Sequence, residues 1–338
     1  MRGRFWHAGP SAATRTERAK RRIIDGRRIE PVDQGGPQNR GFPSGRALGI
    51  EAGMSARIAF QGELGANSHI ACLETHPHLD PLPCPTFEDA FQAAASGEAD
   101  LAMIPVENSI AGRVADIHHL LPTSPLHIVA EHFMPIRFQL MGLKGSRLAD
   151  IRAAHSHTMG LGQCRVFLRS RGIMARTSAD TAGAAREVAE LGDPTQAAIA
   201  PRLAAEVYGL EILAENIEDA AHNTTRFLIM SREHVMPERL QGNWVTAFIF
   251  RVRNVPSALY KAMGGFATNG VNMTKLESYQ VGGAFTATQF YAEVEGHPDD
   301  PSLQRALDEL GFFSTEVRHL GVFSAHPYRS KAALRVSV

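Results

Sequence analysis

Residues 57–74 read RIAFQGELGANSHIACLE, in which an apolar run, a polar loop with two glycines and a helical segment follow one another. The run 57–60 predicts a short buried strand, and 69–74 predicts a helix. The same succession recurs along the chain as far as residue 230. Strands separated by helices predict an α/β fold with parallel sheets, whose polar loops lie where open sheets of this kind bind ligands.

Helix caps and hydrophobic spacing predict the other elements of this first region. Thr86 and Asp89 have the spacing of a capping box, so a helix is expected to begin at Thr86 and to end at Gly97. Further strands are predicted at 101–106, 127–132, 136–142, 197–200, 211–214 and 227–230, and further helices at 160–171, 178–191 and 201–208.

After Pro237 the order of the elements changes. Strands are predicted at 244–252, 271–280, 285–295 and 315–323, and helices at 256–268 and 302–310. This βαββαβ order predicts a small ferredoxin-like domain. The predicted domains are therefore 55–235, with two α/β lobes, and 242–325, with a linker at 233–241 and a tail at 326–338.

The composition is that of a globular protein of 338 residues. Its formal net charge is zero, so no global field points to nucleic acid or to an anionic membrane as a partner. Three cysteines without CxxC spacing argue against a disulfide framework and a zinc site, and they favour a reducing compartment. We therefore expect a cytoplasmic protein without a metal or a cofactor.

Residues 1–54 differ from the rest of the chain. They hold eleven Lys and Arg against five Asp and Glu and show no sustained helical or strand periodicity. Such a segment is predicted to be disordered, because it buries too little apolar surface to offset its conformational entropy. Three interpretations stay open: a disordered extension, a transit peptide and a start codon placed too far upstream.

The loop GELGANS (62–68) joins the first strand to the first helix. Gly62 and Gly65 let the backbone come close to a ligand, and the N–H groups up to Ser68 at the helix start favour an anion. A carboxylate or phosphate cradle and a plain tight turn are both consistent with this loop.

The loop PVENSIAG (105–112) again follows a buried strand. Asn108 and Ser109 either cap a helix or bind a ligand. Glu107 is either an acid or base at the strand end or a solvated carboxylate.

The loop HSHTMGLGQC (155–164) contains His155 and His157, which would share one face of a strand. With no thiolate or carboxylate at ligand spacing, the pair is a weak metal candidate. Ser156 and Gln163 are better explained as neutral hydrogen-bonding groups at a strand–helix junction.

The stretch AHNTTRFLIM (221–230) places an amide, two hydroxyls and an arginine directly before a buried strand. Capping of the strand beside a solvated Arg226 is one explanation. The other is that the strand delivers Thr225 and Arg226 into a cleft between lobes. His222 is either a titrating group or a structural neighbour.

The motifs IAFQGELGANS, PVENSIAG, SHTMGLGQC and NTTRF, in that order, resemble the successive motifs of prephenate dehydratase. The stretch 257–279 looks like the regulatory ACT domain that follows in that family, and the resemblance covers about 57–323. It implies a catalytic domain of two lobes, like type II periplasmic binding proteins, with the active site between them. It also implies conversion of prephenate to phenylpyruvate, CO2 and water.

The resemblance implies roles for particular residues. The catalytic residues would be Asn108, Ser156, Gln163 and Thr225, and Arg226 would bind substrate. The first two polar loops add Gly62, Gly65, Ser68 and Ser109 as candidate substrate-binding residues. Thr158 and Met159 depart from the proline and glutamine that the family commonly has there.

The resemblance to an ACT domain implies that L-phenylalanine is an effector and that the protein is a homodimer or homotetramer. The regulatory residues would be Ala258, Leu259, Asn272, Glu277 and Ser278. The family's GAL-like motif reads SAL here, and its ESRP-like motif reads ESYQ, without the Arg and the Pro. Arogenate dehydratase and a non-catalytic sensor of an aromatic or dicarboxylate ligand are the alternative functions.

Overall fold

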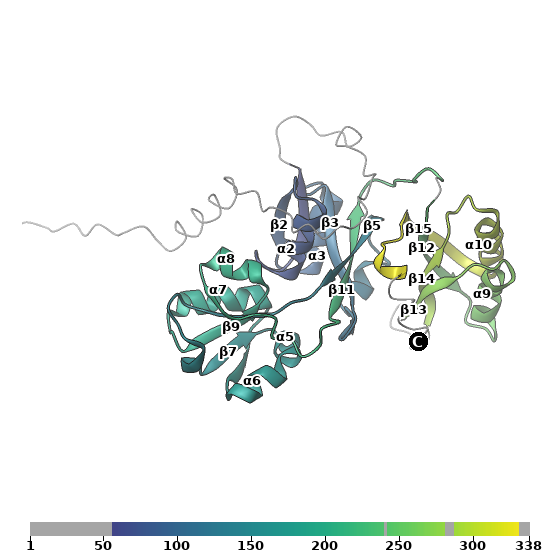
Figure 1. The fold of residues 1–338 in the computed structure, drawn as a ribbon. Helices are drawn as coiled ribbons and strands as arrows, with labels where there is room; N and C mark the ends of the chain where they lie inside the picture. The colour runs from purple at the N-terminus through teal and green to yellow at the C-terminus, as the bar shows by residue number, and fades with distance from the viewer. Residues whose placement is uncertain (1–55, 240–241, 281–286, 331–338) are drawn as a thin grey trace, which may run out of the picture.

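The structure, a computed structural model, describes residues 56–239, 242–280 and 287–330. The predictions for residues 1–54 lie outside this part of the chain. The described residues form two α/β lobes and a C-terminal domain (Figure 1). None of the helices in the described ranges is long and apolar enough to cross a membrane.

The first lobe is built on a sheet with the strand order β2-β1-β3-β11-β5, and the short strand β4 pairs with β3. Strands β1, β2 and β3 are parallel, whereas β11 is antiparallel to both of its neighbours. The strands are β1 (Arg57–Gln61), β2 (Asp80–Cys84), β3 (Leu101–Asn108), β4 (Gly112–Arg113), β5 (His127–Pro135) and β11 (Thr224–Ser231), and the helices are α2 (Asn67–Thr75), α3 (Phe87–Ser96) and α4 (Ile117–Leu120).

The second lobe is inserted between β5 and β11 and has the strand order β10-β6-β9-β7-β8. Its strands are β6 (Gln139–Gly142), β7 (Ala153–Ser156), β8 (Met174–Thr177), β9 (Gln196–Ala200) and β10 (Glu211–Ala214). Its helices are η1 (Leu148–Asp150), α5 (Thr158–Gln163), α6 (Arg165–Arg171), α7 (Thr181–Leu191) and α8 (Arg202–Tyr208).

The structure confirms most predicted elements of the two lobes and also differs from the prediction in several places. The capping box of Thr86 and Asp89 is present, and Gly97 ends the helix in a left-handed conformation. The helix predicted at 160–171 is two helices, α5 and α6, which Cys164 separates. Both sheets are mixed rather than parallel. Strands β2, β4, β7 and β8 and the short helices α4 and η1 are additional to the predicted elements. Strands β2 and β8 lie at sheet edges, where prolines (β2) and full exposure (β8) are tolerated and the sequence signal is weak. Strand β7 is internal, but it has only four residues.

The C-terminal domain has the predicted βαββαβ order and an antiparallel sheet with the strand order β13-β14-β12-β15. Its elements are β12 (Trp244–Val252), α9 (Ala258–Thr268), β13 (Met273–Gln280), β14 (Ala287–Glu295), α10 (Pro301–Phe313) and β15 (Ser314–Ser324). Helices α9 and α10 cover the face turned away from the first lobe (Figure 1). The other face shares a core with the first lobe, in which Ile249 and Leu320 join Leu228 and Met230.

Strand β15 crosses β5 of the first lobe at very short range. A Cβ atom on Gly321 would overlap the carbonyl oxygen of Ile128 and would lie 2.8 Å from its carbonyl carbon. Nearby, the Arg318 guanidinium donates to the carbonyl oxygens of Pro122, at 2.6 Å, and Ser124, at 2.9 Å. The C-terminal domain is therefore docked by backbone contact as well as by apolar packing.

Residues 325–330, which we call the C-terminal segment, fold back onto the first lobe. Tyr328 stacks on Phe133 of β5 with their ring centroids 4.9 Å apart, and its hydroxyl lies 3.4 Å from Thr224 Oγ1. The predicted tail therefore begins with a packed segment, and residues 331–338 lie outside the described residues.

Candidate active site

Four polar side chains from both lobes are joined by hydrogen bonds into what we call the amide–hydroxyl chain: Gln163, Asn223, Asn108 and Thr225. Asn223 Nδ2 donates to Gln163 Oε1 at 2.8 Å, and Asn108 Nδ2 donates to Asn223 Oδ1 at 2.7 Å and to Thr225 Oγ1 at 3.0 Å. Gln163 ends α5 in the second lobe, whereas Asn108 ends β3 in the first. The chain therefore spans the junction between the lobes.

Asn108 is held in one orientation, and this decides what Thr225 can do. The Oδ1 atom of Asn108 accepts hydrogen bonds from the backbone N–H groups of Ile110 and Ala111 at 3.0 and 2.9 Å. Its Nδ2 atom must then face Thr225, whose oxygen accepts the bond. The hydrogen of the Thr225 hydroxyl is left to donate to a ligand.

Asn223 belongs to the site but is not among the predicted site residues. It is fully buried, and it links Gln163 to Asn108. The backbone carbonyl oxygen of Asn223 also accepts a hydrogen bond from the Ile136 N–H at 2.8 Å, and this bond fixes the backbone just before β11. The sequence signal is an amide two residues before Thr225, but the spacing alone does not separate it from a strand cap.

Ser156 and Ser109 support the amide–hydroxyl chain from outside it. Ser156 is fully buried at the end of β7, and its hydroxyl donates to the Ile199 carbonyl at 2.7 Å. Ser109 donates to the His222 carbonyl at 2.8 Å and accepts from the Thr224 N–H at 3.0 Å. Ser109 therefore holds the backbone next to Thr225, whereas Ser156 ties the end of β7, just before α5, to β9.

The first polar loop is arranged differently from the predicted anion cradle. The Gly62 N–H donates to the Cys84 carbonyl, and the Gly65 N–H donates to Nδ1 of His69, both at 2.9 Å. These two amides are therefore occupied, and Ser68 is buried. A Cβ atom on Gly65 would lie 2.8 Å from Ala204 Cα, so the loop serves as a close contact with α8 of the second lobe.

Arg226 is also placed differently from the prediction. Successive residues of a strand point to opposite faces, so Arg226 turns away from the amide–hydroxyl chain that Thr225 meets. Its guanidinium is buried between the carboxylates of Glu131, at 2.8 Å, and Glu293, at 2.8 Å. Burial alone would lower the pKa of Arg226, but Glu293 and Glu131 raise it instead. Arg226 therefore links the first lobe to the C-terminal domain.

Residues 58–235 match the family model described as prephenate dehydratase. The chain belongs to the prephenate dehydratase family. A bifunctional N-acyl-homoserine lactone acylase/prephenate dehydratase of Komagataeibacter europaeus is 51% identical over 81% of this chain and 98% of that protein. Arogenate dehydratase/prephenate dehydratase 1 of Arabidopsis thaliana is 37% identical over 79% of this chain and 71% of that protein.

Two solved structures are also similar. The quorum-quenching acylase GqqA has a TM-score of 0.76 and 51% identity, with 80% of this chain and 99% of that one covered. The prephenate dehydratase of Arthrobacter aurescens, solved with L-Phe, has a TM-score of 0.73 and 30% identity, with 83% and 97% covered. The amide–hydroxyl chain therefore lies in an enzyme of the prephenate dehydratase family.

The histidines of the third loop have ordinary structural partners in this prephenate dehydratase family member. His155 Nε2 lies 3.0 Å from Gln196 Oε1, and His157 caps α5 by accepting from the Met159 N–H at 3.3 Å. Across the part of the chain that the structure describes, no group of three or more His, Cys, Asp or Glu side chains could hold a metal ion.

Two of the five predicted regulatory residues lie on opposite sides of the C-terminal sheet. Leu259 on α9 packs into the core between the sheet and the helices. Glu277 on β13 is instead paired with Lys275, at 2.7 Å, and Lys275 contacts Glu107 of the first lobe. Leu259 and Glu277 therefore lie on opposite sides of the sheet. Ala258 begins α9, Asn272 precedes β13, and Ser278 lies on β13.

His69 predicts an acid-sensitive step in stability. Burial lowers the pKa of His69 from 6.5 to about 4, and its neutral ring accepts the Gly65 N–H. The unfolded chain binds this proton below pH 6.5, whereas the folded chain does so only near pH 4. Stability is therefore lost as the pH falls through this window, by about 3 kcal/mol.

His69→Gln keeps an acceptor for the Gly65 N–H but does not titrate. We expect urea unfolding between pH 7 and 4 to show a shallower pH dependence for this variant than for the wild type. Other buried histidines such as His76 titrate in both proteins, so the difference isolates His69. Parallel curves would contradict the assignment.

Proposed function

We propose that the protein catalyses the decarboxylating dehydration of prephenate to phenylpyruvate and that the amide–hydroxyl chain is its active site. The observation that carries the proposal is the hydroxyl of Thr225, which accepts from Asn108 and so has its hydrogen available. Membership of the prephenate dehydratase family supports the reaction.

The chemistry asks little of the enzyme beyond positioning and hydrogen bonding. The bond between the ring and its carboxylate breaks, and its electron pair forms a ring double bond as the hydroxyl departs. CO2 and an aromatic ring result, the departing hydroxide takes a proton from solvent to become water, and aromaticity drives the reaction. Thr225 donates a hydrogen bond to the departing oxygen, where negative charge develops. Gln163, whose Oε1 is fixed by Asn223, presents its Nε2 to the substrate.

Two further substrates have to be tested besides prephenate. Relatives named arogenate dehydratase are 33–37% identical, so arogenate is the second candidate substrate. The name of one relative also includes an acylase activity. Here Ser156 donates to the Ile199 carbonyl and Ser109 to the His222 carbonyl, so neither hydroxyl is activated by a base as a nucleophile would be.

We also infer that the C-terminal domain is an ACT domain through which L-phenylalanine lowers activity. Its βαββαβ order and the L-Phe complex of the Arthrobacter aurescens relative support this inference. A cytoplasmic location and a homodimer or homotetramer remain predictions.

One assay tests these proposals together. The protein is incubated separately with prephenate, arogenate and an acyl-homoserine lactone, and phenylpyruvate, phenylalanine and free fatty acid are followed. We expect phenylpyruvate from prephenate at the highest rate, and a lower rate when L-phenylalanine is added. Phenylalanine formed faster from arogenate would make arogenate the substrate, and no turnover of either would reject the proposed site.

A further inference from the structure

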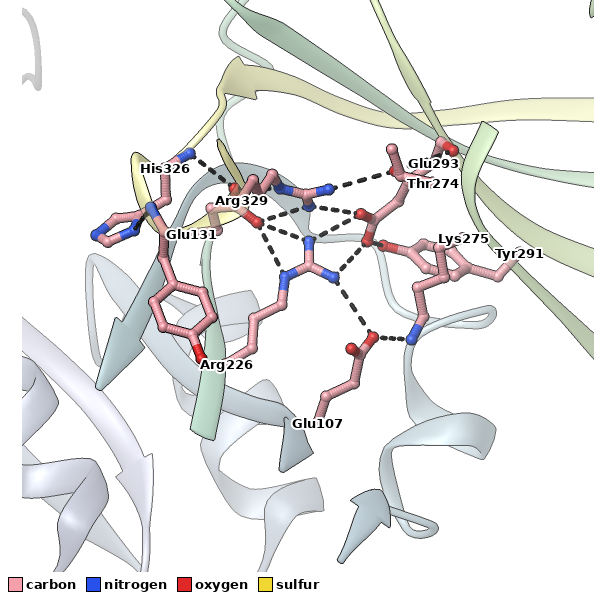
Figure 2. Close-up of polar contacts among 10 residues, drawn as sticks. Glu107, Glu131, Arg226, Thr274, Lys275, Tyr291, Glu293, His326 and Arg329 are labelled. Atoms are coloured by element: carbon pink, nitrogen blue, oxygen red, sulfur yellow. Dashed lines mark hydrogen bonds and ion pairs between the residues drawn. The ribbon is translucent and has the colours of Figure 1, made fainter. Parts of the chain in front are cut away.

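Four charged side chains form what we call the buried ion cluster: Arg226, Arg329, Glu131 and Glu293 (Figure 2). The side chains of Glu131 and Glu293 are 0% and 1% exposed, and that of Arg226 is 5% exposed. Two cations and two anions make the cluster electrically balanced. Its members come from the first lobe, the C-terminal domain and the C-terminal segment.

Each carboxylate binds both arginines. Glu131 lies 2.6 Å from Arg329 Nε and 2.8 Å from Arg226, and Glu293 lies 2.7 Å from Arg329 and 2.8 Å from Arg226. Tyr291 adds a hydrogen bond from its hydroxyl to Glu293 at 2.5 Å. Burial alone would raise the pKa of Glu293, but Arg226 and Arg329 hold it near 2. The four side chains therefore form a ring of charges, and Arg226 also lies 3.5 Å from Glu107 outside the ring.

Such a ring acts as a unit. Desolvation of buried charges offsets most of their attraction, so the net stabilisation by an intact pair is small. Removal of one member leaves an uncompensated buried charge, which costs about 3–5 kcal/mol when one partner of a buried pair is deleted. The position of each member therefore depends on the presence of all the others.

The cluster holds the beginning of β11, where Thr225 lies. Arg226 is the next residue after Thr225, and a shift of β11 that moved one would move the other. On the preceding residue, Thr224 Oγ1 lies 3.4 Å from the hydroxyl of Tyr328 in the C-terminal segment. Both neighbours of Thr225 are thus contacted by residues 325–330 or by their partners.

We propose that Arg226 and Arg329 are positioning residues for Thr225, so that the active-site hydroxyl is aligned only when the C-terminal domain and the C-terminal segment are docked. The inference rests on the proposed role of Thr225. Neither arginine touches the amide–hydroxyl chain. Their effect is carried by the backbone of β11, which the ion cluster holds on one face while Asn108 contacts Thr225 on the other.

Arg329→Met tests the proposal, and Arg318→Met is the matched control. Arg318 is a partly buried arginine of the same domain junction, but it donates to carbonyl groups at 121–124 and not to β11 or β5. Both variants lose an arginine at the junction, and only Arg329→Met breaks the ion cluster. Kinetics are measured well below the melting temperature of each variant.

We expect Arg329→Met to lower kcat by about tenfold to a hundredfold with KM changed by less than about threefold. Arg318→Met should keep kcat within about twofold while lowering the melting temperature. Arg329→Lys, which keeps the charge but loses the bidentate geometry, should lie between the wild type and Arg329→Met. Equal losses of kcat in Arg318→Met and Arg329→Met, or an unchanged kcat in Arg329→Met, would overturn the proposal.

Hydrogen exchange separates this proposal from the proposed function. The backbone amides of residues 224–227 should exchange faster in Arg329→Met than in Arg318→Met, whatever the substrate is. Unchanged exchange at these amides overturns the positioning role even if kcat falls. If Arg329→Met does not fold, Tyr328→Phe removes only the hydroxyl beside Thr224, and it should lower kcat by about twofold to tenfold. An unchanged kcat in that variant would also overturn the proposal.

Discussion

Thr225→Val is expected to lower kcat for prephenate by about 10²–10⁴-fold, while KM changes by less than about threefold. Valine has nearly the shape of threonine but has no hydroxyl, so packing at the start of β11 is kept. The lost hydrogen bond is the one to the departing oxygen, which develops charge only in the transition state. An interaction of this kind appears in kcat rather than in KM.

Thr225→Ser is the matched control, because it restores the hydroxyl that Asn108 orients. We expect it to recover activity to within about tenfold of the wild type. The measurement is steady-state formation of phenylpyruvate, with circular dichroism to verify folding. Wild-type kcat in Thr225→Val would remove Thr225 from the active site.

Gly321→Ala is expected to separate or unfold the junction between the first lobe and the C-terminal domain. Its Cβ would overlap the carbonyl of Ile128, and backbone on both sides leaves neither strand room to move. Overpacking in a rigid core costs about 1–3 kcal/mol and sometimes more, and we expect a loss of at least about 3 kcal/mol here. Urea unfolding and the melting temperature measure this loss.

Gly311→Ala is the control for the same chemical change in the same domain. Gly311 lies in α10, and among the described residues nothing lies within 4 Å of the place that the new methyl group would take. Alanine favours a helix over glycine by about 0.5–1 kcal/mol, so this variant should be slightly more stable than the wild type. Similar destabilisation in both variants would contradict the role given to the close crossing of β15 and β5.

Local pattern predicts most of the fold because each helix and strand carries its own periodicity and caps. The capping box at Thr86 and the βαββαβ order after Pro237 follow from a few neighbouring residues. Edge strands such as β2 lack that signal, since their exposure relaxes the choice of residue. The antiparallel return of β11 depends on the insertion of a whole lobe, which no local pattern records.

The candidate site is predictable only in part, and Arg226 shows why. Thr225 and Arg226 are adjacent on a strand, so the alternation of side chains already forbids both from facing one cleft. Which of them meets the cleft depends on the C-terminal domain, which covers the other face with Glu293. Similarly, the loop pattern predicts the amides of Gly62 and Gly65 as anion donors, but Cys84 and His69 occupy them.

The contact between Glu131 and Arg329 can form only late in synthesis of the chain. These residues lie 198 positions apart, so the carboxylate emerges from the ribosome long before its cation. The apolar side chains of Leu228 and Met230 are likewise covered only after β15 has been synthesised. At the usual rate of translation, this happens about 5–20 s after synthesis of β11. During that interval the nascent catalytic half presents an uncovered sheet face to chaperones and to other nascent chains. The family match thus covers residues 58–235, whereas the residues needed to cover the core of the first lobe extend to residue 330.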